Sequence, residues 1–295
     1  MTDDIPPSRA GARKPEPGLH LVATPIGAAR DITLRALDIL AGADVLAAED
    51  TRTLRHLIEI HGIALAGRPL IAYHDHNGDV ARPRILAALA EGKSVAYASE
   101  AGTPLVADPG MKLARETIAA GHRVLAAPGP SAVLAALSVA GLPTDRFLFA
   151  GFPPASAGAR RSWMNELAAI PATLVIYESP KRVSRTLGEL REIMGESRMA
   201  AVCRELTKRF EDVTRGTLAD LADRFAGQEP KGEIVLVIDR GAEVVATEAD
   251  VELALAGALA APGARIKEVA AEVATRFGLA RRDVYQMALR VAERE

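Results

Sequence analysis

The chain has 295 residues, of which 49% are hydrophobic and 25% are charged, and its formal net charge is −2. This composition is typical of a folded globular protein of about two domains, and it excludes binding of nucleic acid through overall charge. No run of about 18 apolar residues occurs, so we expect no membrane span. The one cysteine, Cys203, excludes an internal disulfide framework, and its apolar surroundings predict a buried structural thiol rather than a nucleophile.

Residues 1–18 are polar and rich in proline, and they lack the apolar segment of a signal peptide. We therefore expect a disordered leader and a cytoplasmic protein.

Between residues 19 and 141, short apolar runs alternate with helical patterns, which predicts an α/β domain with a largely parallel sheet. Asp31 and Asp108 are expected to cap helices, the latter because a proline follows it. Pro83 is expected in the first turn of a helix. The expected strands are residues 19–23, 44–49, 69–73, 94–99 and 123–128.

Residues 142–242 are predicted to form a second α/β domain, in which Ser179 caps a well-defined helix. Residues 245–295 are rich in alanine and read as helix, Gly-Leu turn, helix. This tail is interpreted either as a helix-turn-helix or as a small capping bundle. The expected strands of the second domain are residues 147–152, 172–178, 198–206 and 232–239.

The loops that follow the first five strands are polar or shaped by Gly and Pro, and ligands of parallel sheets bind at that edge. Five such loops on one edge predict a ligand site. The loops are residues 24–31, 49–55, 74–77, 99–110 and 128–132.

The chain has neither a G-x-x-x-x-G-K-[ST] phosphate loop nor a G-x-G-x-x-G after the first strand, so a triphosphate or ordinary dinucleotide site is not expected. His74, Asp75 and His76 at one strand end do not make a metal site by themselves. A rigid edge with few fixed charges suits a zwitterionic or weakly cationic ligand.

Six motifs occur in order between Leu19 and Ile238: VATPIGAARDITLRALDILAGADVLAAEDTR, YHDHN, SEAGTPLVADPG, PGPSAVLAALSVAGLPTDRFLFAGF, YESPKRV and KGEIVLVI. Together they resemble the tetrapyrrole-methylase superfamily and, within it, the bacterial 16S rRNA cytidine 2′-O-ribose methyltransferases. Ala28 stands where that family usually has Asn, and Glu100 stands where it usually has Asp.

The resemblance implies two α/β domains of the tetrapyrrole-methylase type with a cleft for S-adenosylmethionine between them, followed by a small helical domain that docks RNA. It further implies that the loop 99–104 holds the amino acid part of the cofactor with its backbone. The residues expected at the cofactor are Pro25, Glu100, Ala101, Gly102, Thr103, Pro104, Ser131, Ala132, Tyr177, Glu178, Arg204 and Glu205.

A ribose hydroxyl is a poor acid, so a nearby base or cation should assist its methylation. The groups around EDTR (49–52) and HDHN (74–77) are preferred, although Asp50 and Arg52 are alternatively only a helix cap. The candidate catalytic residues are Glu49, Asp50, Arg52, His74, Asp75, His76 and Lys181, with Glu205 also considered.

RNA contacts are expected from scattered cations, because phosphates provide most nucleic-acid affinity. Trp163 and Tyr285 are candidates for base stacking or for the core. The family further implies 16S rRNA within the small subunit as partner, near the decoding centre, and a homodimer. Alternatives are a methyltransferase of a tetrapyrrole or other small metabolite, and a regulator that binds nucleic acid. The candidate RNA-binding residues are Arg160, Arg161, Lys181, Arg182, Arg281 and Arg282.

Overall fold

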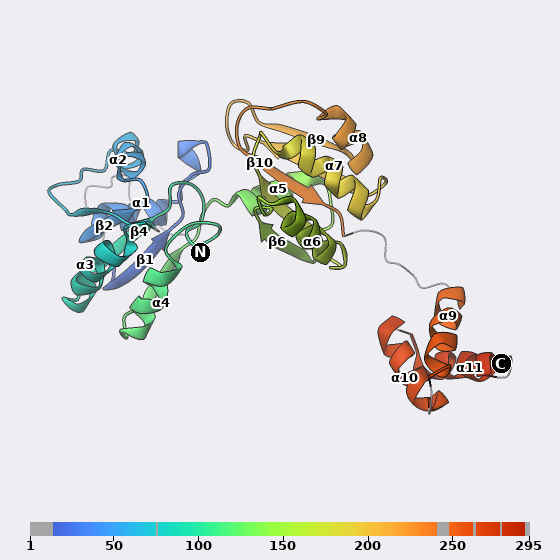
Figure 1. The fold of residues 1–295 in the computed structure, drawn as a ribbon. Helices are drawn as coiled ribbons and strands as arrows, with labels where there is room; N and C mark the ends of the chain where they lie inside the picture. Colours follow the sequence, from blue (N-terminus) through green and yellow to red (C-terminus); the bar gives the residue numbers. More distant parts are fainter. Residues whose placement is uncertain (1–13, 75, 241–247, 262–263, 278, 293–295) are drawn as a thin grey trace, which may run out of the picture. The chain divides into compact units, whose positions relative to one another are not determined.

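The computed structural model describes residues 14–74, 76–240, 248–261, 264–277 and 279–292 (Figure 1). Residues 1–13 of the predicted leader lie outside the described residues, as does Asp75, whereas Gly18 at its end already begins a strand. The chain divides into two compact units, Met1–Gly241 and Ala242–Glu295.

The first unit contains two separate five-stranded sheets. The first sheet is parallel throughout, in the order β3-β2-β4-β1-β5, as the alternation of strands and helices predicts. Ala98 is in register with both Val22 and Ala48, so the loops after β1, β2 and β4 start at one edge. The strands are β1 (Gly18–Val22), β2 (Val45–Ala48), β3 (Leu70–Ala72), β4 (Ser94–Ala98) and β5 (Val124–Ala127).

The helices around this sheet start at other residues than the sequence predicts. Asp31 lies in a short 3-10 turn, and Thr33 caps the next helix by accepting a hydrogen bond from the backbone N–H of Ala36. Asp108 is not a cap, because the helix it precedes begins after Gly110. Pro83 lies in the second turn of its helix. The elements are η1 (Ala29–Asp31), α1 (Leu34–Gly42), α2 (Thr51–Ile60), α3 (Gly78–Ala90) and α4 (Met111–Ala119).

The second sheet has the order β6-β7-β10-β8-β9 and is mixed: only the β6–β7 pair is parallel. Strand β9 is not predicted from the sequence, because this edge strand, DVTRGT, has a single large apolar residue. The strands are β6 (Phe147–Gly151), β7 (Thr173–Glu178), β8 (Met199–Arg204), β9 (Asp212–Thr217) and β10 (Ile234–Ile238).

Helix α5 (Ala132–Ala140) packs on the second sheet, where Val133 and Leu137 share a core with Val175 and Cys203. The chain therefore passes from the first sheet to the second before α5, and the predicted boundary at residue 141 is too late. Cys203 is 1% exposed, and burial raises the pKa of its thiol to about 12. The prediction of an inert structural thiol is confirmed.

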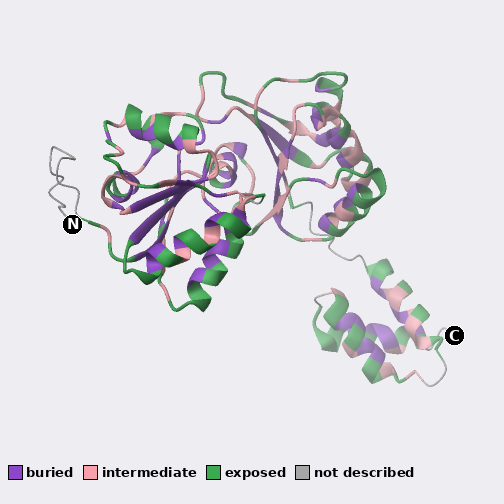
Figure 2. Cartoon of the chain, turned by 60° about the vertical axis from the view of Figure 1, so that its left-hand side comes forward, coloured by how far each residue is buried: buried purple, intermediate pink, exposed green. Residues whose placement is uncertain are grey.

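Helices α6 (Ala157–Ala168), α7 (Val183–Met194) and α8 (Leu218–Arg224) enclose a second core with this sheet. Helix α7 begins after Arg182, so Ser179 is not its cap. The central strands of both sheets are buried, while the helices keep exposed outer faces (Figure 2).

The second unit is a bundle of α9 (Glu248–Leu259), α10 (Ile266–Phe277) and α11 (Arg281–Ala292). Its own core includes Leu255 and Val284, both fully buried. No helix among the described residues is long and apolar enough to cross a membrane.

Candidate active site

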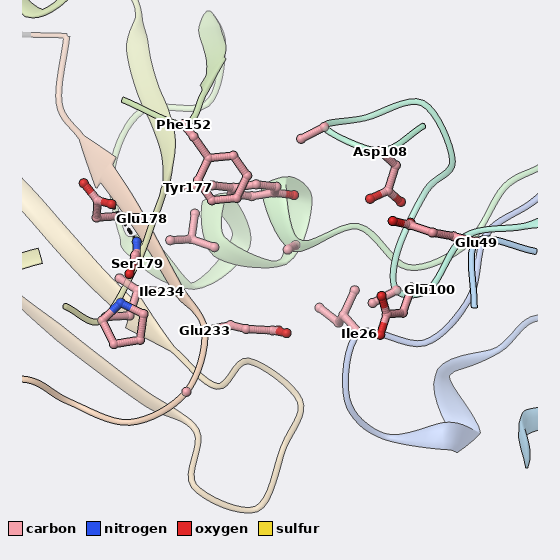
Figure 3. A pocket seen from close by; sticks show the side chains of 16 residues that line it. Ile26, Glu49, Glu100, Asp108, Phe152, Tyr177, Glu178, Ser179, Glu233 and Ile234 are labelled. Atoms are coloured by element: carbon pink, nitrogen blue, oxygen red, sulfur yellow. Dashed lines mark hydrogen bonds between the residues drawn. The ribbon is translucent and has the colours of Figure 1, made fainter. Parts of the chain in front are cut away.

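A pocket of about 490 Å³ lies between the two halves of the first unit (Figure 3). One side carries three carboxylates, which we call the acidic wall: Glu49, Glu100 and Asp108. The opposite side carries the rings of Phe152 and Tyr177, which we call the aromatic wall, together with apolar Ile234 and Val235 and polar Glu178, Ser179 and Glu233. The carboxyl edge of the first sheet thus faces the second half of the unit, as the five loops predict.

The acidic wall follows from the topology of the first sheet. Glu49 comes directly after β2, and Glu100 and Asp108 lie in the loop after β4. Because β2 and β4 are paired neighbours, their loops leave the sheet side by side.

Asp108 is the most perturbed carboxyl of this wall. Its Oδ2 atom is buried and has no hydrogen-bond partner among the described residues. Burial, followed by the negative charges of Glu49 and Glu100, raises the pKa of Asp108 to about 7.

The backbone of the loop after β4 is tied to its neighbours. The N–H of Gly102 donates to the carbonyl of Thr24 over 3.0 Å, and the carbonyl of Gly102 accepts from Thr24 N–H over 2.9 Å. Thr103 Oγ1 donates to the carbonyl of Pro130 over 3.0 Å. Both backbone groups of Gly102 are thus paired within the protein, and the expectation that the loop 99–104 holds the cofactor with its backbone stays a prediction.

The second part of this loop is shaped to present Asp108. Leu105 and Ala107 have φ values of 71° and 59°, a left-handed conformation that costs a non-glycine residue roughly 1–3 kcal/mol. A Cβ atom at Gly110 would lie 2.8 Å from the ring of Tyr97, so only glycine fits there. The Tyr97 hydroxyl donates to the carbonyl of Pro109 over 3.1 Å and fixes the chain next to Asp108.

On the aromatic wall, the rings of Phe152 and Tyr177 meet edge to face with centroids 5.4 Å apart. Phe152 is 54% exposed and offers a free face to a ligand. Burial, with a contribution from the charge of Asp108, raises the pKa of Tyr177 to about 12. The phenol therefore remains protonated at neutral pH, and in Figure 3 it points toward the acidic wall.

A contact between the first loop and the segment after β8 joins the two halves beside the pocket. The backbone N–H of Ala28 donates to Thr207 Oγ1 over 3.1 Å. A Cβ atom at Gly27 would lie 2.5 Å from Lys208 Cγ, so the loop approaches this closely only with glycine. Lys208 pairs with Glu205 over 2.9 Å.

Five of the predicted cofactor residues line the pocket: Glu100, Ala101, Ala132, Tyr177 and Glu178. The others lie outside its lining: Pro25, Gly102, Thr103, Pro104, Ser131, Arg204 and Glu205. The carboxylate of Glu205 is occupied by Lys208 and by the N–H of Glu233.

The main lining residues that the sequence analysis missed are Ile26, Asp108, Phe152, Glu233, Ile234 and Val235. Asp108 lies in the motif SEAGTPLVADPG, and Phe152 ends the motif that begins PGPSA. Their positions, in a Gly/Pro-rich loop and at the end of a strand, could have identified them as lining residues.

Of the candidate catalytic residues that the structure describes, Glu49 alone lines the pocket. Asp50 caps α2 by accepting from the N–H of Arg52 over 2.7 Å, and the two side chains pair over 2.7 Å. Hydrogen bonds from Arg52 lower the pKa of Asp50 to about 2. The cap alternative is thus supported, and Asp50 is a poor proton acceptor.

The other described candidates, His74, His76 and Lys181, are not part of the pocket lining. The rings of His74 and His76 meet edge to face with centroids 6.1 Å apart. Lys181 is exposed in the turn before α7. Asp75 lies outside the described residues, and among those that are described no group of three or more His, Cys, Asp or Glu could hold a metal ion.

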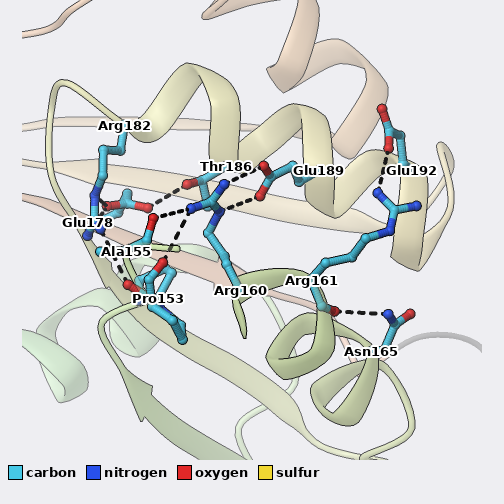
Figure 4. A network of polar contacts seen from close by, with 11 residues as sticks. Pro153, Ala155, Arg160, Arg161, Asn165, Glu178, Arg182, Thr186, Glu189 and Glu192 are labelled. Carbon is cyan, nitrogen blue, oxygen red and sulfur yellow. Dashed lines mark hydrogen bonds and ion pairs between the residues drawn. The ribbon is translucent and has the colours of Figure 1, made fainter. Parts of the chain in front are cut away.

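Arg160 is not an RNA-binding surface residue, contrary to expectation. It is 2% exposed and binds Glu189 with two nitrogens, over 2.5 and 2.7 Å (Figure 4). Arg182 pairs with the buried Glu178 over 2.8 Å. Arg161 remains exposed, with a partner in Glu192 at 3.1 Å.

Arg281 and Arg282 line a hollow of about 720 Å³ in the second unit, together with Lys267 and Tyr285. Tyr285 is 36% exposed, whereas Trp163 packs partly against the core of the second sheet.

The pocket fits S-adenosylmethionine, which carries a sulfonium, an ammonium and a carboxylate. Its volume lies within the roughly 300–1,000 Å³ of cofactor sites. The lining includes carboxylates but neither Lys, Arg nor His, so it favours a cation over a phosphate. The aromatic wall offers a stacking surface for an adenine.

The model of the tetrapyrrole (corrin/porphyrin) methylases matches residues 18–222, and the chain belongs to this family. The family expected from the six motifs is confirmed, and with it the methyltransferase class that uses S-adenosylmethionine.

Within the family, the chain is 49% identical to ribosomal RNA small subunit methyltransferase I of Mesorhizobium japonicum, over 89% of each chain. It is 40% identical to the protein of the same name from Pseudomonas aeruginosa, over 92% of this chain and 96% of that one.

Two solved structures share the fold. Cobalt precorrin-4 methyltransferase is 20% identical, with a TM-score of 0.57 over 79% of this chain and 97% of the other. Uroporphyrin-III C-methyltransferase from Thermus thermophilus, in complex with S-adenosyl homocysteine, is 19% identical, with a TM-score of 0.51 over 75% of this chain and 96% of the other.

Proposed function

We propose that this protein methylates the ribose 2′-oxygen of one cytidine in 16S rRNA, in the decoding-centre region of the small subunit. The observation that carries the proposal is a pocket lined by carboxylates, with no Lys, Arg or His in its lining, between two α/β halves of a chain that is 49% identical to a ribosomal RNA small subunit methyltransferase. The cytidine and the 2′-oxygen follow from the motif resemblance.

S-Adenosylmethionine would supply an activated methyl group bound to a positively charged sulfur. Glu49 and Glu100 of the acidic wall would attract this charge, and the aromatic wall would hold the adenine. The residues of this chain would then position the ribose hydroxyl in line with the methyl group, which is the main contribution that a protein makes to such a transfer.

The second unit is the proposed docking site for RNA. Arg281, Arg282 and Lys267 surround a hollow that also presents the exposed edge of Tyr285. Cations next to an aromatic ring are the combination that binds phosphates and stacks on bases. A methyltransferase of a tetrapyrrole or other small metabolite has no need for this unit, which favours RNA over that alternative. We further propose that the enzyme acts as a homodimer in the cytoplasm.

The test uses S-adenosylmethionine with a labelled methyl group. Purified protein is offered small ribosomal subunits from cells lacking its gene, naked 16S rRNA or a tetrapyrrole precursor, and the label is located by mass spectrometry. Label on the ribose of one cytidine is expected. Label on a base would contradict methylation at the 2′-oxygen. Label on the tetrapyrrole alone would contradict RNA as the substrate.

A further inference from the structure

Asp108 combines features that the binding of a cofactor does not require. Its Oδ2 atom is buried beside the pocket and lacks a hydrogen-bond partner among the residues described. Such an atom is costly to maintain unless a ligand uses it. The loop that presents it is strained at Leu105 and Ala107 and anchored through Tyr97, so its position is imposed by the fold.

The charged and titratable groups around Asp108 come from several elements. Glu49 follows β2, Glu100 lies in the same loop as Asp108, and Tyr177 faces them from the end of β7. Arg52 of α2 interacts with Glu100 but is already paired with Asp50. Asp108 is therefore surrounded by like charges and a neutral phenol.

We propose that Asp108 is the catalytic proton acceptor, which removes the proton from the substrate hydroxyl during methyl transfer. This inference rests on the proposed function. In the balanced reaction, the hydroxyl oxygen forms a bond to the methyl carbon, the carbon–sulfur bond breaks with its electron pair left on sulfur, and the hydroxyl proton passes to Asp108 Oδ2. Solvent then takes this proton, and the carboxylate is restored.

The neighbouring groups are less suited to this role. Tyr177 remains protonated at neutral pH, because its pKa is raised to about 12. Asp50 is held ionised by Arg52, with a pKa lowered to about 2, and so has little affinity for a proton. A carboxyl with a pKa of about 7 is well matched to general-base catalysis near neutral pH.

The decisive variant is Asp108→Asn, which has nearly the same shape but accepts a proton poorly. We expect kcat to fall by about 100-fold or more, while calorimetry finds an unchanged Kd for S-adenosyl homocysteine. The wild-type enzyme should gain activity as the pH rises through about 7, since the ionised carboxylate is the active form. This rise, the ascending limb of the pH–activity profile, should be absent from the variant.

A second pair of variants tests the same idea without altering Asp108. Glu100→Gln removes a neighbouring negative charge that raises the pKa of Asp108. The rise in activity should therefore move to lower pH. Glu233→Gln is the matched control: this residue also lines the pocket, but it pairs with Lys208 and should leave the pH of the limb unchanged.

Full activity of Asp108→Asn, or an unchanged limb, would overturn the proposal. Loss of cofactor binding in this variant would also overturn it, since Asp108 would then be a binding residue. These outcomes are distinct from a failure of the proposed function, which would appear in the wild-type enzyme as label away from the ribose.

Discussion

Two clusters of charged side chains in the first unit differ in how their polar atoms are paired. In the cluster around Arg160, nearly every polar atom has a partner: the guanidinium contacts Glu189 and the carbonyls of Pro154 and Ala155. Nearby, the buried carboxylate of Glu178 accepts from Arg182, Thr186 and the N–H of Ser179. In the acidic wall, by contrast, three carboxylates lie near one another, and a buried oxygen of Asp108 has no hydrogen-bond partner within the part of the chain that the structure describes.

This difference separates scaffold from site. Buried charges that are fully paired hold the elements around them in place, and they are damaging only when one partner is removed. Like charges gathered at a pocket reduce stability, and their perturbed pKa values mark a functional site.

The largest expected effect is that of Arg160→Ala, which leaves Glu189 without its partner. The free energy of unfolding should fall by about 3 kcal/mol, as for other broken buried pairs. Urea denaturation measures this loss. Arg161→Ala is the matched control on the same helix, because the Arg161–Glu192 pair is exposed and worth at most about 1 kcal/mol. Equal losses in the two variants would contradict the assignment of Arg160 to the scaffold.

The acidic wall should respond in the opposite direction, because Asp108→Asn removes a charge that the fold disfavours. The pKa of Asp108 is raised from 3.8 to about 7 on folding. The wild-type protein therefore loses stability relative to the variant as the pH rises from about 4 to about 7, and the full difference remains above that window. After allowance for partial exposure, we expect the variant to be more stable by about 1–2 kcal/mol at pH 8.

The measurement is urea denaturation of both proteins at about pH 4.5, where Asp108 is mostly protonated in the folded state, and at about pH 8, where it is mostly ionised. A difference in stability that does not change with pH would refute the raised pKa.

The aromatic wall should affect binding more than folding. Phe152→Ala removes a half-exposed ring and should weaken binding of S-adenosylmethionine by about 1 kcal/mol, or roughly fivefold. Calorimetry measures this change. Phe147→Ala, at the start of β6, the strand that ends just before Phe152, should leave the affinity unchanged. Equal effects of the two variants would argue against stacking on Phe152.

The smallest effect per residue is expected from exposed cations. Arg281→Ala and Arg282→Ala should each reduce the salt dependence of RNA binding by about one counterion. Filter binding over a range of salt concentrations measures the slope. Lys267→Ala should act similarly, and a slope unchanged in all three variants would exclude this hollow as the RNA surface.

The sequence predicts the parallel sheet and the ligand edge well, because apolar strands and Gly/Pro-shaped loops are local signals. It places Asp108 wrongly, since an Asp-Pro pair usually starts a helix, whereas here the left-handed Gly110 delays that start. Arg160 and Arg161 look alike in sequence, and only Glu189, on another helix, makes one of them buried. Strand β9 cannot be recognised from its sequence, because an edge strand needs few apolar residues.

The buried thiol of Cys203 has a practical consequence for experiments on this enzyme. Because it is the only cysteine of the chain and is 1% exposed, maleimide reagents should not label the native protein. A cysteine introduced at an exposed position outside the hollow, such as Gln286, would then carry a fluorophore as the sole label. Docking of RNA onto the helical unit could be followed in real time, with no background from the catalytic half.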